Sequence, residues 1–318
     1  MKKFHYASLG FSILFAVLCR EFYKNDYSYL AQLFLVLVSS FYFGPLLYFF
    51  SCSVDNYDSF KVSGAKVRWC LLALHTPYFI GLLANEKMCQ EPGINLVFVF
   101  AWFGLAAFTR MFQSVKNFLI LSLILCIWFA FEWDLFVLWK GSLYFLNVLM
   151  AINLVILLFP IFIGIRPFDL QFKFNYLWSK PLHVYSSLFL LIAVPYGMAS
   201  GFLQVKEKIE IAQIPVQFLA IFFFNALPEE VLFRGLLQKH MEQYMNQYAS
   251  LFLVSFVFGI AHLNNFPSWD YRFVIISFMA GLCFGMVYIK TKSMIPAALM
   301  HTLVNTTNEV VFDKVPLI

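Results

Sequence analysis

Charged side chains are scarce in this sequence. Its 318 residues include 22 lysines and arginines and 17 aspartates and glutamates, so that 12% of the residues are charged while 62% are hydrophobic. A soluble domain normally has a charged fraction of about 25%, most of it at the surface. The scarcity of charge therefore excludes an ordinary soluble protein.

Several familiar motifs are also missing. The six cysteines lie far apart and form no C-x-x-C pair, so we interpret them as small apolar residues rather than as a disulfide framework. Neither G-x-S-x-G nor H-E-x-x-H occurs. The net charge of +5 is spread over short segments, without a basic patch interleaved with aromatic residues, which argues against nucleic acid as a partner.

Long apolar runs dominate the chain instead. A transmembrane helix needs about 20 predominantly apolar residues, and helices are the usual way to satisfy backbone polar groups in lipid. We therefore predict an all-α fold, a polytopic transmembrane helical bundle with about 9 to 11 spans. The candidate runs are 4–19, 28–50, 69–84, 94–108, 117–131, 143–164, 183–200, 213–228, 250–263, 273–289 and 294–312.

A stretch with two prolines and mixed charge, 165–182, is the best candidate for a linker. It divides the chain into an accessory N-terminal transmembrane region, 1–165, and a C-terminal region, 166–318, where polar intramembrane residues concentrate. We expect a multi-pass protein that is surrounded by lipid in the plasma (inner) membrane of a prokaryote. The sequence does not indicate an oligomeric state.

Two adjacent glutamates follow an uncharged stretch, 214–226. Carboxylates at membrane depth are costly and usually mark a functional site. Glu230 and Arg234 are spaced i,i+4 and can form an ion pair, whereas Glu229 projects about 100° away around the helix. This asymmetry predicts that Glu230 and Arg234 brace the helix and that Glu229 acts as a base. The alternative is a solvated helix start at the membrane surface.

The local sequence predicts that a helix begins just before these glutamates. Pro228 suits the first turn of a helix, where its missing N–H costs nothing. Asn225 can break or cap the preceding helix. Negative charge in a first helical turn is favoured by the helix dipole.

Two further pairs of polar or aromatic residues occur on later apolar runs. Phe258 and His262 are one helical turn apart, as are His301 and Asn305, so each pair shares a face. Both members of the second pair can donate hydrogen bonds, as an oxyanion requires. The alternatives are a hydrogen-bonded core histidine for His262 and a polar clamp between helices for His301 and Asn305.

Together these residues fit hydrolysis of an acyl bond by an activated water molecule. Glu229 and His262 would hold and deprotonate the water. His301 and Asn305 would stabilise the tetrahedral intermediate.

The three ordered motifs, EExxxR at 229–234, FxxxH at 258–262 and HxxxN at 301–305, resemble those of the CPBP family, also called Abi. These are the CAAX prenyl protease and bacteriocin-processing intramembrane proteases, and the matching region extends from about 214 to 308. The resemblance implies an intramembrane glutamic endopeptidase that cleaves a membrane-associated peptide or protein, as some members do when they remove three terminal residues from prenylated proteins. It implies that Glu229 is the catalytic base and that His262 is its partner on the water. It also implies that His301 and Asn305 form the oxyanion hole. Its supporting residues would be Glu230, Arg234 and Phe258.

Two other functional interpretations of the same residues remain open. Glu229, His262 and His301 could bind Zn²⁺ as in His₂Glu hydrolases, and the family has often been described as metalloproteases. Because Asn305 is a poor zinc ligand and a good oxyanion donor, we favour a mechanism without a metal or other cofactor. A transporter or a non-proteolytic scaffold would also place such residues in the membrane, but a transporter predicts repeated halves that the sequence lacks.

Overall fold

The computed structural model describes residues 179–266 and 269–316, together with the isolated residues 37 and 122. The described residues from 179 onward belong to one compact unit. The predicted N-terminal region, 1–165, and the first six predicted spans lie outside the described residues, apart from those two positions. The structure therefore bears on the C-terminal region, which contains all three motifs.

Four long helices confirm the predicted apolar runs of this region. They are α7 (Lys180–Ala199), α11 (Gln247–Ala261), α12 (Tyr271–Thr291) and α13 (Met294–Val311). Their boundaries lie within a few residues of the predicted ones. Two begin with a capping side chain, because Asn246 accepts hydrogen bonds from the first turn of α11 and Asp270 does so for α12.

The first motif lies on a helical segment that is continuous from residue 211 to 241. It comprises η7 (Ile211–Gln213), α8 (Ile214–Ile221), η8 (Phe222–Ala226), α9 (Leu227–Glu230), η9 (Val231–Gln238) and α10 (Lys239–Met241). Pro228 lies in the first turn of α9 as predicted, but the preceding residues stay helical in the wider π form of η8. Asn225 therefore does not break or end the preceding helix. A π turn can accommodate a proline that would otherwise disrupt the helical ladder.

One small sheet departs from the all-α prediction. Strands β1 (Leu203–Val205) and β2 (Phe312–Lys314) pair antiparallel, with Gln204 opposite Asp313. The guanidinium of Arg272 joins this sheet to the helices, because it donates to the carbonyl oxygens of Ser200 (3.0 Å) and Val315 (2.7 Å). The ends of α7 and α13 are thus held together.

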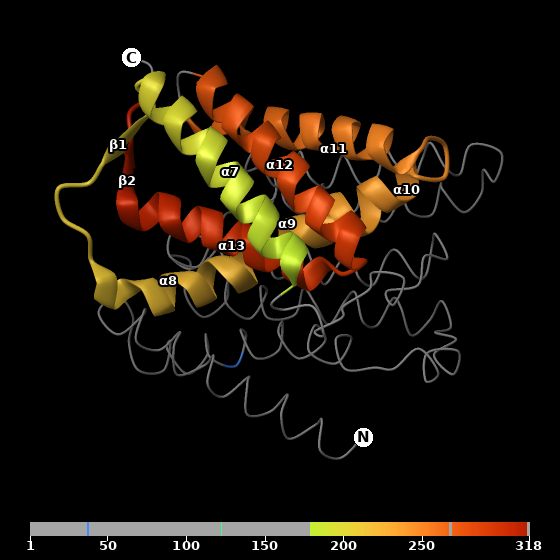
Figure 1. The fold of residues 1–318 in the computed structure, drawn as a ribbon, viewed down its shortest axis with the longest axis horizontal. Coiled ribbons are helices and arrows are strands. Elements are labelled where there is room, and N and C mark those ends of the chain that lie inside the picture. The colour runs from blue at the N-terminus through green and yellow to red at the C-terminus, as the bar shows by residue number, and fades with distance from the viewer. Residues whose placement is uncertain (1–36, 38–121, 123–178, 267–268, 317–318) are drawn as a thin grey trace, which may run out of the picture. The chain divides into compact units, whose positions relative to one another are not determined.

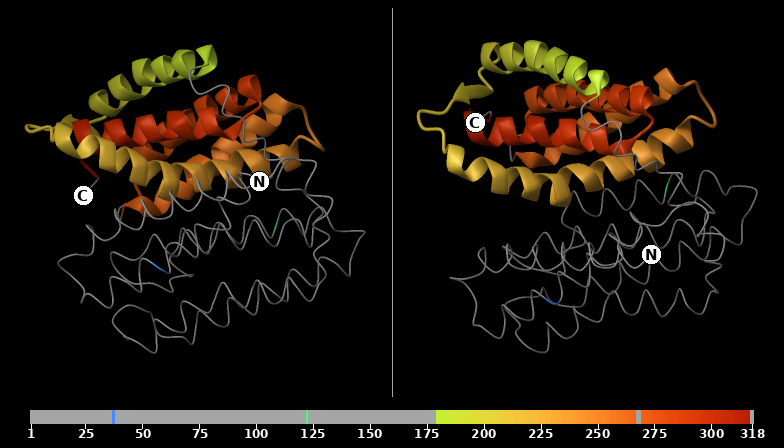
Figure 2. Two further views of the ribbon diagram at one scale, coloured as in Figure 1. Left: turned by 90° about the horizontal axis from the view of Figure 1, so that it is seen from below. Right: turned by 60° about the horizontal axis from the view of Figure 1, so that its bottom comes forward.

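Helix α13 occupies the middle of the bundle. It lies between α7 and α8 in the views of Figures 1 and 2 and contacts both. Helix α12 packs against α7, α11 and α13. The turn of α13 that precedes the third motif is largely buried, with Ala297, Ala298 and Met300 all at 0% exposure. This places the third motif in the interior, opposite the helix that carries the first.

Helices α11 and α12 approach each other closely at two glycines of α12. A Cβ atom at Gly281 would lie 3.2 Å from the Cα of Ser255, and one at Gly285 would displace the side chain of Leu251. Because the Cα of Ser255 belongs to the backbone of α11, a larger residue at Gly281 would push the helices apart. This contact keeps α11, which carries the second motif, close to the rest of the bundle.

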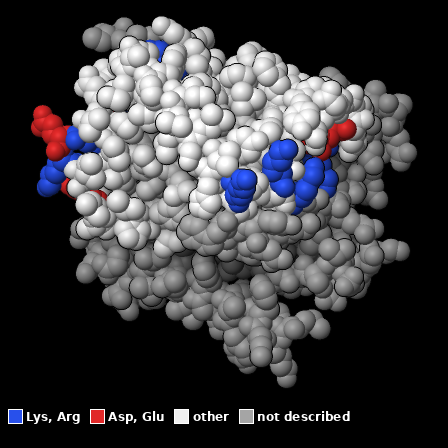
Figure 3. All heavy atoms as spheres, in the orientation of Figure 1, with Lys and Arg blue, Asp and Glu red and all other residues white. Residues whose placement is uncertain are grey.

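Two of the described helices, α7 and α12, are long and apolar enough to cross a membrane. Large apolar side chains also lie exposed on α7 and α11, including Leu191, Phe252 and Phe256. Figure 3 shows groups of charged side chains separated by uncharged surface on this face of the described part. Both observations suit an integral membrane protein.

Candidate active site

The two glutamates of the first motif lie in different environments. The side chain of Glu230 is 0% exposed, and its Oε2 atom lies 3.1 Å from Nε of Arg234, which is equally buried. The side chain of Glu229 is 12% exposed. The predicted ion pair is therefore present, and Glu229 is the more accessible of the two carboxylates.

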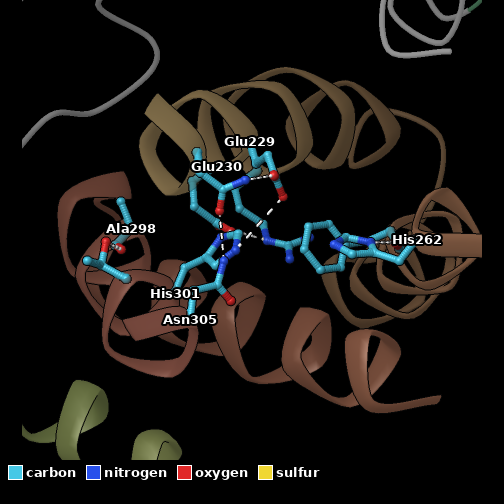
Figure 4. Close-up of polar contacts among 10 residues, drawn as sticks. Glu229, Glu230, His262, Ala298, His301 and Asn305 are labelled. Atoms are coloured by element: carbon cyan, nitrogen blue, oxygen red, sulfur yellow. Dashed lines mark hydrogen bonds and ion pairs between the residues drawn. The ribbon is translucent and has the colours of Figure 1, made fainter. Parts of the chain in front are cut away.

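His301 lies between these carboxylates (Figure 4). Its Nδ1 atom is 3.1 Å from Oε1 of Glu230, and its Nε2 atom is 3.9 Å from Oε2 of Glu229. Since a carboxylate only accepts, Nδ1 carries the hydrogen that Glu230 binds. The longer distance is too great for a direct hydrogen bond.

The ring of His301 is held in place by two aromatic neighbours. Phe284 of α12 stacks on it at 4.5 Å between centroids with an interplanar angle of 18°, and Phe258 of α11 meets it edge-on at 5.8 Å. The imidazole is only 2% exposed. Its orientation toward the glutamates is thus fixed by packing as well as by the hydrogen bond to Glu230.

Asn225 joins the first and third motifs. Its Nδ2 atom donates to Oε1 of Glu229 at 2.6 Å, and its Oδ1 atom accepts from Nδ2 of Asn305 at 2.7 Å. Asn225 and Asn305 are 80 positions apart in the chain. The sequence analysis missed Asn225 as a site residue, although its i,i+4 spacing from Glu229 was a signal that could have found it.

Phe258 connects the second motif to the others. Its ring lies 4.6 Å from that of His262, and the guanidinium carbon of Arg234 lies 5.3 Å from its centroid, within the range of a cation–π contact. The Nδ1 atom of His262 is 2.7 Å from the backbone oxygen of Phe258. Because a carbonyl oxygen accepts, the proton of a neutral His262 lies on Nδ1, and Nε2 is left as an acceptor.

The four predicted catalytic residues thus divide into two groups. Glu229, His301 and Asn305 form one connected set with Asn225, as Figure 4 shows for the labelled members. His262 meets this set through the ring of Phe258, which contacts both imidazoles.

The alternative zinc site requires Glu229, His262 and His301 to converge on one point. Among the described residues, no three histidine, cysteine, aspartate or glutamate side chains are arranged to hold a metal ion. His301 instead directs Nδ1 to Glu230, and the Phe258 ring packs against both histidines. The ligand set therefore does not fit zinc as these side chains lie.

A comparison with known protein families agrees with the resemblance that the three motifs indicated. Residues 211–307 match the family described as type II CAAX prenyl endopeptidase Rce1-like, and this range contains all three motifs. The match covers less than a third of the chain and agrees with the range of about 214 to 308 expected from the sequence. No curated protein and no solved structure matched the chain.

Proposed function

We infer that the chain is a CAAX-type endopeptidase of the membrane, since its residues 211–307 match the family described as type II CAAX prenyl endopeptidase Rce1-like. The observation that carries this proposal is the position of Glu229 beside α13: its Oε2 atom lies 3.9 Å from Nε2 of His301, and Asn225 links its Oε1 atom to Asn305. A carboxylate that can take a proton from water, near a carboxamide that can donate to an oxyanion, is what water-mediated hydrolysis of a peptide bond requires. The protein would lie in the inner membrane of a prokaryote and cross it several times.

In the proposed reaction, Glu229 removes a proton from a water molecule as its oxygen attacks the carbonyl carbon of the substrate. A C–O bond forms, and the carbonyl oxygen takes up the negative charge of the tetrahedral intermediate. When the C–N bond breaks, the proton held by Glu229 passes to the leaving nitrogen. Glu229 is suited to this exchange because it is less enclosed than Glu230.

His262 would assist on the water. Its Nδ1 atom is engaged by the backbone oxygen of Phe258 at 2.7 Å, which leaves Nε2 as a hydrogen-bond acceptor. An acceptor at this position can orient the attacking water without competing with Glu229 for the same proton. His262 need not touch Glu229 in the free enzyme, since catalytic contacts often tighten only when the substrate binds.

His301 and Asn305 would stabilise the oxyanion. Asn305 has a second N–H besides the one bound by Asn225, and it can donate that hydrogen to the substrate. His301 can donate from Nε2 only when both ring nitrogens carry protons, because Nδ1–H is already directed at Glu230. Glu230 and Arg234 would hold His301 in this orientation, with Phe258 packed against both the imidazole and the guanidinium.

A direct test uses the purified protein in detergent and a farnesylated peptide that ends in a C-a-a-X sequence. The proposal predicts release of the terminal tripeptide, detected by mass spectrometry. The same peptide without the farnesyl group is the control for substrate class. Cleavage of both peptides would support an endopeptidase without prenyl specificity, whereas cleavage of neither would contradict the CAAX-type assignment.

The natural substrate can be sought in cells. Membrane and secreted peptides from cells with the wild-type protein are compared with those from cells that carry Glu229→Ala. A peptide terminus that is lost only in the variant identifies a cleaved bond. Identical peptide profiles at equal protein abundance would contradict the proposed proteolysis.

A further inference from the structure

Asn225 makes two hydrogen bonds at the candidate site, although it belongs to none of the three motifs. It lies on η8 (Phe222–Ala226), one turn before Glu229, and both bonds are shorter than 2.8 Å. One bond holds the carboxylate of Glu229 and the other holds the carboxamide of Asn305. Its side chain thus touches both the proposed base and a proposed oxyanion donor.

The chemistry of the three groups fixes the direction of these bonds. An ionised carboxylate only accepts, so the NH₂ group of Asn225 must face Glu229. Its carbonyl oxygen must then face Asn305, which presents its own NH₂ group. Hydrogen bonds are therefore donated in one direction, from Asn305 to Asn225 and from Asn225 to Glu229, and this direction determines how both carboxamides are oriented. The NH₂ group of Asn305 is directed into the site rather than away from it.

The backbone supports the same arrangement. Residues Phe222–Ala226 adopt a π-helix, as do Val231–Gln238, and the α-helical turn that carries Glu229 lies between these two segments. Short π segments are energetically less favourable than an α-helix and occur frequently at functional sites. In this chain the first segment contains Asn225 and directly precedes the turn that carries Glu229. Asn225, with its two hydrogen bonds, thus lies in the first of the two π segments that flank Glu229.

We propose that Asn225 is a positioning residue, which sets the orientation of Glu229 and Asn305 relative to each other before the substrate binds. This inference rests on the proposed function, because it concerns the roles of Glu229 and Asn305 in peptide hydrolysis. Asn225 itself does not exchange a proton. Its effect is on the geometry of the two groups that do contact the reacting atoms.

Two substitutions separate the two bonds. Asn225→Ala removes both. Asn225→Asp keeps the size of the side chain and an acceptor for Asn305, but an ionised aspartate cannot donate to Glu229 and adds a like charge beside it. We expect kcat to fall about 10- to 100-fold in Asn225→Ala, with KM changed less than about threefold, since small displacements of catalytic groups cost rates of this size. The decrease in kcat should be at least as large in Asn225→Asp.

A matched control is Asn246→Ala. Asn246 caps α11 by accepting from the backbone nitrogens of Tyr248 (3.1 Å) and Ala249 (2.9 Å), and its side chain is exposed. Its loss should lower stability without changing kcat per folded molecule. If Asn225 had only a structural role, its variants would behave in the same way. A kcat within twofold of the wild-type value in Asn225→Ala would overturn the proposal.

The inference can also fail separately from the proposed function. Thermal unfolding of Asn225→Ala, Asn305→Ala and the double variant measures the coupling between these residues without any substrate. A loss in the double variant that is smaller than the sum of the single losses supports the link. Strictly additive losses would overturn it, even if the wild-type protein cleaves peptides. Absence of cleavage by the wild-type protein would instead count against the proposed function, and the coupling alone would then decide whether the link exists.

Discussion

Replacement of Arg234 by methionine should destabilise the protein severely. Arg234 and Glu230 are both 0% exposed, and their ion pair spans 3.1 Å. Removing one partner of a buried pair costs about 3–5 kcal/mol, because the other charge is left in a medium of low polarity. Typical folded proteins are stable by only about 5–15 kcal/mol, so the loss is a large fraction of the total.

The same side chain also contributes packing. The guanidinium carbon of Arg234 lies 5.3 Å from the centroid of Phe258 and 6.0 Å from that of Phe233. Methionine preserves part of this apolar contact, whereas alanine leaves a cavity beside both rings. Arg234→Ala should therefore be less stable than Arg234→Met. The double variant Glu230→Gln with Arg234→Met removes both charges and should recover much of the loss.

The assay is thermal unfolding of the purified variants in one detergent. The measured quantity is the fraction of protein that remains monodisperse after heating. The expected order of stability is wild type, the double variant, Arg234→Met and then Arg234→Ala. An Arg234→Met protein as stable as the wild type would refute the reasoning. So would a double variant no more stable than the single one, because the loss of the cationic partner of Glu230 would then not be the cause.

Three other predictions concern packing, the His301 ring and metals. Gly281→Val should cost about 1–3 kcal/mol in unfolding free energy, since a Cβ there would lie 3.2 Å from the backbone Cα of Ser255, and an unchanged melting temperature would contradict the close helix contact. Phe284→Leu should lower kcat while KM changes less, because His301 loses the ring that stacks on it at 4.5 Å, and an unchanged kcat would contradict this. Exhaustive chelation should leave peptidase activity intact, whereas loss of activity that added Zn²⁺ restores would overturn the metal-free proposal.

Local sequence patterns were sufficient to predict the helices of the C-terminal region. The runs at 183–200 and 273–289 correspond to α7 and α12, because long apolar stretches in this composition have few alternatives to a helix. The ion pair between Glu230 and Arg234 was predictable for a similar reason. Both residues lie on one helix, so their spacing alone brings them within reach.

Contacts between distant segments were harder to predict. The i,i+4 rule assigns His301 and Asn305 to one face of α13 but does not say which helix that face meets. The hydrogen bond between Asn225 and Asn305 spans 80 positions and depends on how α13 packs against the helix of the first motif. The π-helical turn at Phe222–Ala226 was also missed, because Pro228, with Asn225 three residues before it, indicated the start of a new helix.

The stacking of Phe284 on His301 was equally inaccessible from the sequence. Phe284 lies in the middle of an apolar run with many other aromatic residues, and nothing in its spacing distinguishes it. Only the close packing of α12 against α13 brings its ring to 4.5 Å from the imidazole. The aromatic neighbours of His301 are thus a product of tertiary packing.

The most direct test of the central claim is the rate of peptide cleavage by Glu229→Gln beside that of the wild type. Glutamine keeps the size of the side chain and can still accept a hydrogen bond from Asn225, but it cannot take a proton from water. We predict that kcat falls by about 10²- to 10⁴-fold, the usual contribution of a general base, while the melting temperature stays close to that of the wild type. A Glu229→Gln protein that cleaves the peptide at the wild-type rate would contradict the assignment of Glu229 as the base.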